Sequence, residues 1–163
     1  MTKHAQGPVL VPIDFSPHSE EALAWAAEYG RLADVPLLVL HVVHDPESDP
    51  GYYRRAWEKA RGPDDPMIRI DEIAAKLMGK FLHQVAARHP GLSDDLPTRL
   101  VTGVPATRII EVAEEVDARH IVVGSHGRTR LSRMLLGSKA EQVLRLASIP
   151  VTIVKADRAF DAS

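Results

Sequence analysis

Three glycines surround a cationic loop late in the chain, in the stretch VVGSHGRTRLSRMLLGSK over residues 122–139. Gly124 ends a short apolar run, Gly127 follows in the loop, and Gly137 directly precedes Ser138 at the start of a predicted helix. The first turn of a helix presents backbone N–H groups without an intrahelical partner and a partial positive charge, which together bind phosphate. Glycine lets an anion approach the backbone closely. The stretch therefore indicates either a site for a phosphorylated ligand or a plain connection between a strand and a helix.

Basic side chains would add to the attraction for an anion at this loop. Arg128, Arg130 and Arg133 lie between the second and third glycines, and Lys139 follows Ser138. The order Gly-Ser-Lys and the upstream glycine spacing differ from those of a Walker A loop. The dinucleotide fingerprint follows the first strand of its fold, whereas this stretch comes late in the chain. Both of these phosphate-binding motifs are therefore excluded.

Two other groupings of reactive side chains are weaker. Ser125 and His126 suggest a nucleophile with its base, but adjacent residues seldom present their side chains to one another, and the chain has no G-x-S-x-G motif. His41 and His44 share the end of a predicted strand, yet two ligands do not make a zinc site. We therefore assign no catalytic residue and no metal ligand from the sequence.

The segments that carry these residues alternate between strand and helix patterns. Continuous apolar runs such as VLVPI are typical of strands that are covered on both faces. Right-handed crossovers then place helices on both faces of a parallel sheet. The sequence predicts an α/β fold in one domain, 1–163, with an open five-stranded parallel sheet and four helices. The predicted strands cover residues 9–13, 37–43, 99–101, 120–124 and 151–154, and the predicted helices begin near Pro17, Ile70, Pro105 and Ser138.

Every distinctive loop follows a strand in this scheme: PIDFS, HVVHD, VTGVP and GSHGRTR. In open parallel sheets, ligands bind at the carboxyl ends of the strands, where the strand order reverses. We therefore expect these loops to meet at one rim of the sheet.

A polar segment punctuated by prolines, residues 44–66, interrupts the alternation. We expect a mobile insertion or lid there, with one helical turn around residues 53–60, and a frayed tail over residues 156–163. The run GYYRRAWEKAR would suit stacking on a base, but the absence of a wider basic surface favours a lid or a contact with a partner.

Composition narrows the class of protein. The net charge of −2 gives no basic field for nucleic acid, and the absence of cysteine excludes disulfides and thiolate catalysis. No apolar run approaches the about 18 to 20 residues of a membrane span. We expect a soluble, cytoplasmic protein with no membrane or nucleic-acid partner.

The spacing Gly124-x2-Gly127-x9-Gly137-Ser138, with VPIDFS near the start and IPVTIV near the end, resembles the universal stress protein family in its ATP-binding branch. The similarity runs from residue 9 to residue 154, and the glycine spacing distinguishes ATP-binding members. Many relatives have glycine where this chain has Arg130, which leaves the spacing intact. The resemblance implies a Rossmann-like fold of the adenine nucleotide alpha hydrolase type.

This resemblance also implies a ligand, ATP, with any Mg²⁺ held mainly by phosphate oxygens and water. It places Asp14 near the ribose or adenine, beside Pro12 and Ile13; the alternative for Asp14 is a role at the entry of the following helix. The backbone of Val43, or of Val42 if the strand ends earlier, would read the adenine edge, although either side chain also suits the core.

The remaining implied positions lie around the phosphates. Gly103 would shape a third wall of the pocket or serve only as a turn, and Lys139 would bind phosphate or remain solvated. The phosphates would be surrounded by Gly124, Ser125, Gly127, Arg128, Gly137, Ser138 and Lys139.

Function follows from the same resemblance. It implies an ATP-binding regulatory protein of the stress response, with at most slow ATP hydrolysis and an unknown protein partner. Relatives dimerise through their last strand, which is an exposed edge in an open sheet, so we expect a homodimer through residues 151–154. The alternatives are a nucleotide hydrolase or adenylate-transferring enzyme, and a nucleotide-free dimeric scaffold.

Overall fold

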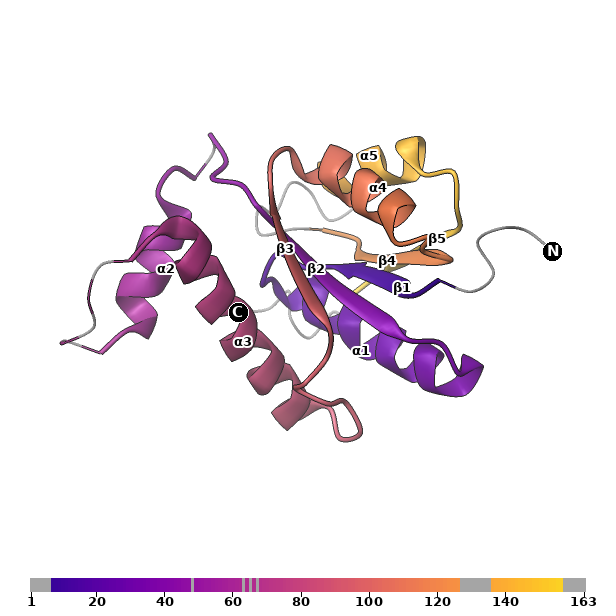
Figure 1. Cartoon of the computed structure of the whole chain (residues 1–163), viewed down its shortest axis with the longest axis horizontal. Coiled ribbons are helices and arrows are strands. Elements are labelled where there is room, and N and C mark those ends of the chain that lie inside the picture. Colours follow the sequence, from indigo (N-terminus) through magenta and orange to yellow (C-terminus); the bar gives the residue numbers. More distant parts are fainter. Residues whose placement is uncertain are drawn as a thin grey trace.

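A five-stranded parallel sheet forms the centre of the molecule (Figure 1). The structure is a computed structural model that describes residues 7–47, 49–62, 64, 66, 68–126 and 136–156. The strand order is β3-β2-β1-β4-β5, and each neighbouring pair is parallel. The predicted α/β fold with an open parallel sheet is confirmed. The strands are β1 (Val9–Pro12), β2 (Leu37–Val43), β3 (Thr98–Thr102), β4 (His120–Gly124) and β5 (Val151–Val154).

Helices cover both faces of this sheet because successive strand residues point to opposite faces. Val9 and Val11 of β1 pack into a core with α1 (Pro17–Ala33) and α3 (Ile70–Arg88). Leu10, between them, packs into a second core with α4 (Pro105–Glu115) and α5 (Ser138–Leu146). All three side chains are fully buried. A continuous apolar run is therefore what this double-sided strand requires.

The segment after β2 differs from the expected single helical turn. It forms a nine-residue helix, α2 (Tyr52–Ala60), so the described residues contain five helices rather than four. Tyr53 and Trp57, four residues apart on one face of α2, are 1% and 6% exposed. They pack with Val43 of β2 and Ile73 of α3. This packing stabilises a helix that would be too short to persist alone in water.

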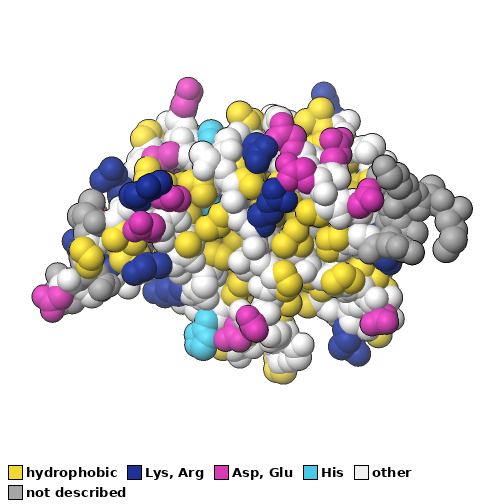
Figure 2. Space-filling view, viewed as in Figure 1, with side chains coloured by type: hydrophobic (Ala, Val, Ile, Leu, Met, Phe, Trp, Pro, Cys, Tyr) yellow, Lys and Arg dark blue, Asp and Glu magenta, His cyan; other side chains and the backbone are white. Residues whose placement is uncertain are grey.

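Charged side chains of both signs are interspersed on the face shown in Figure 2. This face therefore has no large field of one sign, in keeping with the net charge of −2. Among the helices of the described residues, none is long and apolar enough to cross a membrane.

A histidine links the last two strands near their amino ends. His120 Nε2 lies 2.6 Å from Thr152 Oγ1 of β5. The His120 ring also meets the Tyr29 ring edge-on, with the ring centroids 5.6 Å apart. Burial lowers the pKa of His120 below its ordinary value, because the protein interior disfavours the charged imidazolium.

This lowered pKa predicts a pH dependence of stability. The unfolded chain binds a proton at His120 near its ordinary pKa of about 6.5, whereas the folded protein binds it only at lower pH. The contribution of His120 is therefore fully present above that pH and is lost as the pH falls toward the lowered pKa. Urea unfolding of the wild type and of His120→Gln at about pH 7.5 and about pH 5.5 measures it. The variant should lose less stability on acidification, and equal losses would contradict the prediction.

Candidate functional site

The chain leaves β1 through a tightly held turn that fixes Asp14. Ser16 caps α1, since its Oγ accepts the Ser19 N–H at 3.2 Å. Asp14 Oδ1 accepts two hydrogen bonds, from the Ser16 N–H at 3.1 Å and from the Ser19 hydroxyl at 3.0 Å. The helix-entry role that the sequence offered as an alternative for Asp14 is thus present. These two bonds also set the direction of the second carboxylate oxygen.

Asp14 Oδ2 faces the start of α5 across the point where the strand order reverses. From β1 the chain continues to β2 on one side, and β4 lies on the other side. Lys139 Nζ, in the first turn of α5, is 3.9 Å from Asp14 Oδ2, and the Asp14 side chain is 15% exposed. The structure therefore brings a carboxylate and an ammonium group from distant parts of the sequence to the switch point of the sheet.

The first turn of α5 lies beside the ends of β4 and β5. The Ser125 N–H donates to the Val154 carbonyl at 2.8 Å, and the Ser125 backbone carbonyl accepts the Gly137 N–H at 2.7 Å. Gly137 is the N-cap residue, and in the described structure no side chain caps the helix. The first intrahelical bond there is from the Glu141 N–H to the Gly137 carbonyl. The N–H groups of Ser138 and Lys139 thus precede that bond, and they lie where a helix start attracts an anion.

Gly124 has a packing role that the sequence analysis did not foresee. A Cβ atom at this position would lie 2.8 Å from both the backbone carbon and the carbonyl oxygen of His18 in α1. The first turn of α1 therefore rests directly on the end of β4, where only a glycine leaves enough room. Within the described residues, the close contact that requires a glycine at position 124 is thus with α1 of the protein itself and not with a ligand.

Val43 and Gly103 contact each other at the ends of β2 and β3. The Gly103 N–H donates to the Val43 carbonyl at 3.3 Å, and Gly103 has φ of +141°. Val43 is 7% exposed and packs in the core with Tyr53, so the core alternative for its side chain is present. The backbone carbonyls of successive residues point to opposite edges of a strand. The Leu40 carbonyl accepts the Ile13 N–H on the β1 side. Val42 is two residues further along β2, so its backbone faces the same side.

Ser125 and His126 interact, contrary to expectation. Ser125 Oγ lies 3.1 Å from His126 Nδ1, and Ser125 is 4% exposed. His126 Nε2 is buried without a hydrogen-bond partner, so in the described part of the chain no third group orients the ring as in a catalytic triad. The same residues contain no cluster of three or more groups able to hold a metal ion.

Two predicted site residues, Gly127 and Arg128, lie outside the described residues. The others come together as three groups at the carboxyl ends of the strands: Pro12, Ile13 and Asp14; Val43 and Gly103; and Gly124, Ser125, Gly137, Ser138 and Lys139. Residues that the sequence analysis missed are Ser19, which holds Asp14, and Tyr53, which is bonded to His41. The spacing of Ser16 and Ser19 after Asp14 is the signal in the sequence that would have revealed the role of Ser19.

The fold is an open parallel α/β domain. Its rim lies at the point where the strand order reverses, which is where open sheets of this class bind ligands. The model of the universal stress protein family matches residues 7–155. The chain therefore belongs to the universal stress protein family.

Individual relatives match over nearly the whole chain. The universal stress protein MJ0577 of Methanocaldococcus jannaschii is 27% identical over 154 residues, which cover 90% of this chain and 93% of that protein. Its solved structure has a TM-score of 0.61 at 26% identity and covers 93% of this chain and 96% of that one.

Two solved relatives hold an adenine nucleotide. A universal stress protein from Archaeoglobus fulgidus in complex with dAMP has a TM-score of 0.57 at 24% identity and covers 91% of this chain and 98% of that one. A universal stress protein in complex with cAMP has a TM-score of 0.59 at 24% identity, with coverage of 94% and 99%. At these identities the likeness is one of fold.

Proposed function

We propose that this protein binds ATP at the carboxyl rim of the sheet and acts as a nucleotide-dependent regulator of the stress response. The observation that carries the proposal is the α5 start, which no side chain of the described residues caps and which faces Asp14 at the switch point. Its N–H groups and Lys139 suit phosphates, and a carboxylate suits ribose hydroxyls. The dAMP and cAMP complexes of two relatives support an adenine nucleotide as the ligand class.

Each group of residues has a proposed part in binding. Pro12, Ile13 and Asp14 would line the ribose and base side together with Gly103. The adenine edge would be read by a backbone group at the end of β2. The two candidates are Val43 and Val42, and the backbone of Val42 faces β1. The phosphates would lie among Gly124, Ser125, Gly127, Arg128, Gly137, Ser138 and Lys139. Mg²⁺ would be held mainly by phosphate oxygens and water.

Regulation by occupancy, rather than rapid turnover, suits the groups at this rim. The Ser125–His126 pair lacks an orienting carboxylate among the described residues, and a positioned base is what ATP hydrolysis would need. We propose ATP hydrolysis that is slow at most. A steady-state turnover above about 1 s⁻¹, near the low end of typical enzymes, would instead indicate a dedicated enzyme.

The proposal includes an assembly and a location. β5 is an edge strand whose four residues are all half-buried. Pairing with β5 of a second copy would satisfy its free edge, so we propose a cytoplasmic homodimer through Val151–Val154 that signals to a protein partner. A monomer in sedimentation at micromolar concentration would contradict the homodimer.

The binding test is calorimetry with ATP and AMP on the wild type and on Gly127→Val/Gly137→Val. Valine side chains would keep phosphates away from the backbone N–H groups. Losing even one charge-assisted bond weakens binding about tenfold, so the double variant should bind ATP at least about tenfold more weakly, with a smaller effect on AMP. The matched control is Gly62→Val/Gly79→Val, since a Cβ at either glycine meets open space. Normal ATP affinity in Gly127→Val/Gly137→Val would eliminate the proposed site.

A further inference from the structure

A buried histidine replaces the sheet hydrogen bonds where β1 ends. The last backbone bond between β1 and β2 at this end is from the Ile13 N–H to the Leu40 carbonyl, at 2.8 Å. The Ile13 carbonyl then lies 2.7 Å from Nδ1 of His41, a side chain on β2. His41 Nε2 lies 2.9 Å from the hydroxyl of Tyr53 on α2. His41 and Tyr53 are 2% and 1% exposed, so these contacts lie in the protein interior.

The Ile13 carbonyl, the His41 ring and the Tyr53 hydroxyl form a chain of hydrogen bonds. The direction of each bond in this chain follows from the groups at its ends. The Ile13 carbonyl only accepts, so His41 Nδ1 carries the proton and donates. In the neutral ring Nε2 then accepts, and the Tyr53 hydroxyl donates to it. The Tyr53 oxygen in turn accepts the His44 N–H at 3.1 Å. The neutral His41 ring with its proton on Nδ1 therefore satisfies every group in the chain.

The same peptide unit carries the Ile13 carbonyl and the Asp14 N–H. His41 binds the carbonyl, and the Asp14 N–H donates to Ser19 Oγ at 3.3 Å. The unit is planar, so bonds at both sides set its orientation and with it the direction of the Asp14 side chain. Phe15, the next residue, has φ of +64°, and its ring lies 4.3 Å from the His41 ring, centroid to centroid. His41 thus contacts the turn both before and after Asp14.

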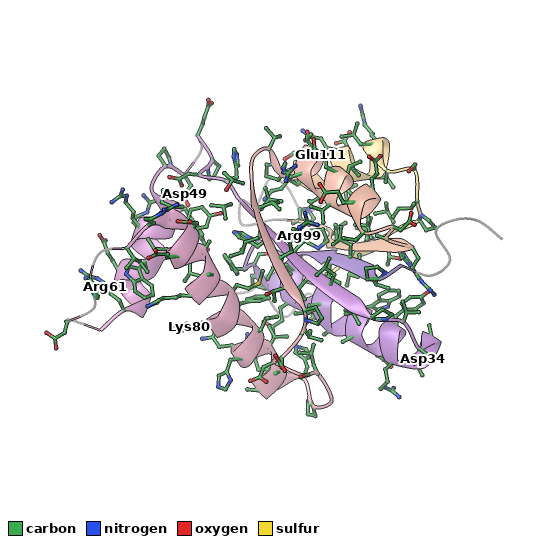
Figure 3. All side chains as sticks on the ribbon, in the orientation of Figure 1. Asp34, Asp49, Arg61, Lys80, Arg99 and Glu111 are labelled. Carbon is green, nitrogen blue, oxygen red and sulfur yellow. The ribbon has the colours of Figure 1, made fainter. Side chains whose placement is uncertain are left out.

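The hydrogen bonds end on α2, which lies in the sequence between Asp49 and Arg61, both labelled in Figure 3. An exposed cap, the Asp45 carboxylate, accepts the N–H groups of Gly51 and Tyr52 at 2.8 and 3.1 Å. The Tyr53 hydroxyl is the buried link between this helix and the ends of β1 and β2.

We propose that His41 and Tyr53 are a positioning pair that couples α2 to Asp14. This inference rests on the proposed function for the identity of the ligand: the pair holds the carboxylate in the direction that receives the ribose. Movement of α2 and reorientation of Asp14 are then linked, so ribose binding stabilises the packed position of α2.

The test compares Tyr53→Phe with the matched control Tyr52→Phe. The control removes a hydroxyl from the neighbouring ring, whose centroid is 5.3 Å from that of Tyr53, but it leaves the three bonds of the chain intact. Without nucleotide, ¹⁵N NMR should show the proton of His41 on Nδ1 in the wild type and in both variants, because the Ile13 carbonyl fixes it there. The Nε2 resonance should shift only in Tyr53→Phe, which removes the hydroxyl that donates to Nε2. Hydrogen exchange of the α2 amides should rise about tenfold, the change that the loss of one buried hydrogen bond gives. Unchanged spectra and exchange would overturn the pair.

Two ligands then separate positioning from general loosening of the fold. Tyr53→Phe should weaken ATP binding about tenfold and leave the binding of inorganic tripolyphosphate, which has no ribose, unchanged. Equal losses for both ligands, or none for ATP, would overturn the positioning role. Failure of the wild type to bind ATP would remove the proposed function instead, and the ¹⁵N NMR and hydrogen-exchange measurements would still test the pair.

Discussion

Gly124→Ala is expected to lower the free energy of unfolding by about 3 kcal/mol, the upper range for overpacking a well-packed interior. The added Cβ would lie 2.8 Å from backbone atoms of His18. Backbone in the first turn of a helix cannot rotate away as a side chain can. α1 would therefore have to shift relative to β4, and the turn that holds Asp14 would shift with it. Urea unfolding should show the midpoint lowered by about 1 to 2 M, with weaker ATP binding in calorimetry.

The control for this prediction is the same substitution where space is open. Gly79 lies within α3, is exposed, and a Cβ there meets no atom within 4 Å. Gly79→Ala should raise the free energy of unfolding by about 0.5 to 1 kcal/mol, because alanine loses less backbone entropy in a helix. Effects of the same sign at both glycines would refute the steric explanation for Gly124.

Glu20→Ala is expected to lower the free energy of unfolding by about 2 kcal/mol through the loss of charge-assisted hydrogen bonds. Glu20, in the first turn of α1, receives bonds from Arg88 Nε at 2.8 Å and Arg88 Nη2 at 2.6 Å. His89 Nε2 lies 3.0 Å from the same carboxylate. The Glu20 side chain is only 9% exposed, and its bond raises the pKa of Arg88. This cluster joins the start of α1 to the end of α3.

Glu21 is the matched control, one residue further along α1. It has no ion pair or side-chain hydrogen bond among the described residues, so Glu21→Ala should change stability by less than about 0.5 kcal/mol. Because both substitutions remove one acidic charge near the start of a helix, the difference between them isolates the contacts of Glu20. Urea unfolding near neutral pH measures both, and equal effects would show that the cluster contributes nothing beyond general charge.

Much of the fold could be predicted because local patterns decide it. The apolar run of β1, the Ser16 cap followed by Pro17, and the proline before β5 fixed these elements within a residue or two. β3 extends one residue beyond the predicted strand at each end, and α2 is longer than predicted. The helical register of α2 depends on Tyr53 and Trp57 finding a core with Ile73. Ile73 is distant from α2 in the sequence. A nine-residue helix also has little intrinsic stability, so local sequence patterns alone predict it poorly.

The candidate site was predictable in its glycine spacing but not in its contacts. Each glycine looked equally suited to a phosphate, yet the space at Gly124 is taken by the backbone of His18, and the Gly137 N–H binds Ser125. The meeting of Asp14 with Lys139 required the sheet order, since 125 positions separate them in the sequence. The sequence showed only that His41 and His44 share a strand end and do not make a zinc site, whereas the structure gives His41 two buried partners, Ile13 and Tyr53.

From the sequence alone we could predict the five strands, the helices other than α2, the rim at which the loops meet, and the resemblance to the family to which the chain belongs. These properties depend on residues near one another in the chain, where periodicity, caps and turn residues act directly. The contacts between distant residues became clear only once the elements were packed together: the space at Gly124, the approach of Lys139 to Asp14, and the hydrogen bonds from Ile13 through His41 to Tyr53. Such contacts arise when separate elements pack, and a hydrogen bond or a clash depends on a few tenths of an ångström that no local pattern encodes.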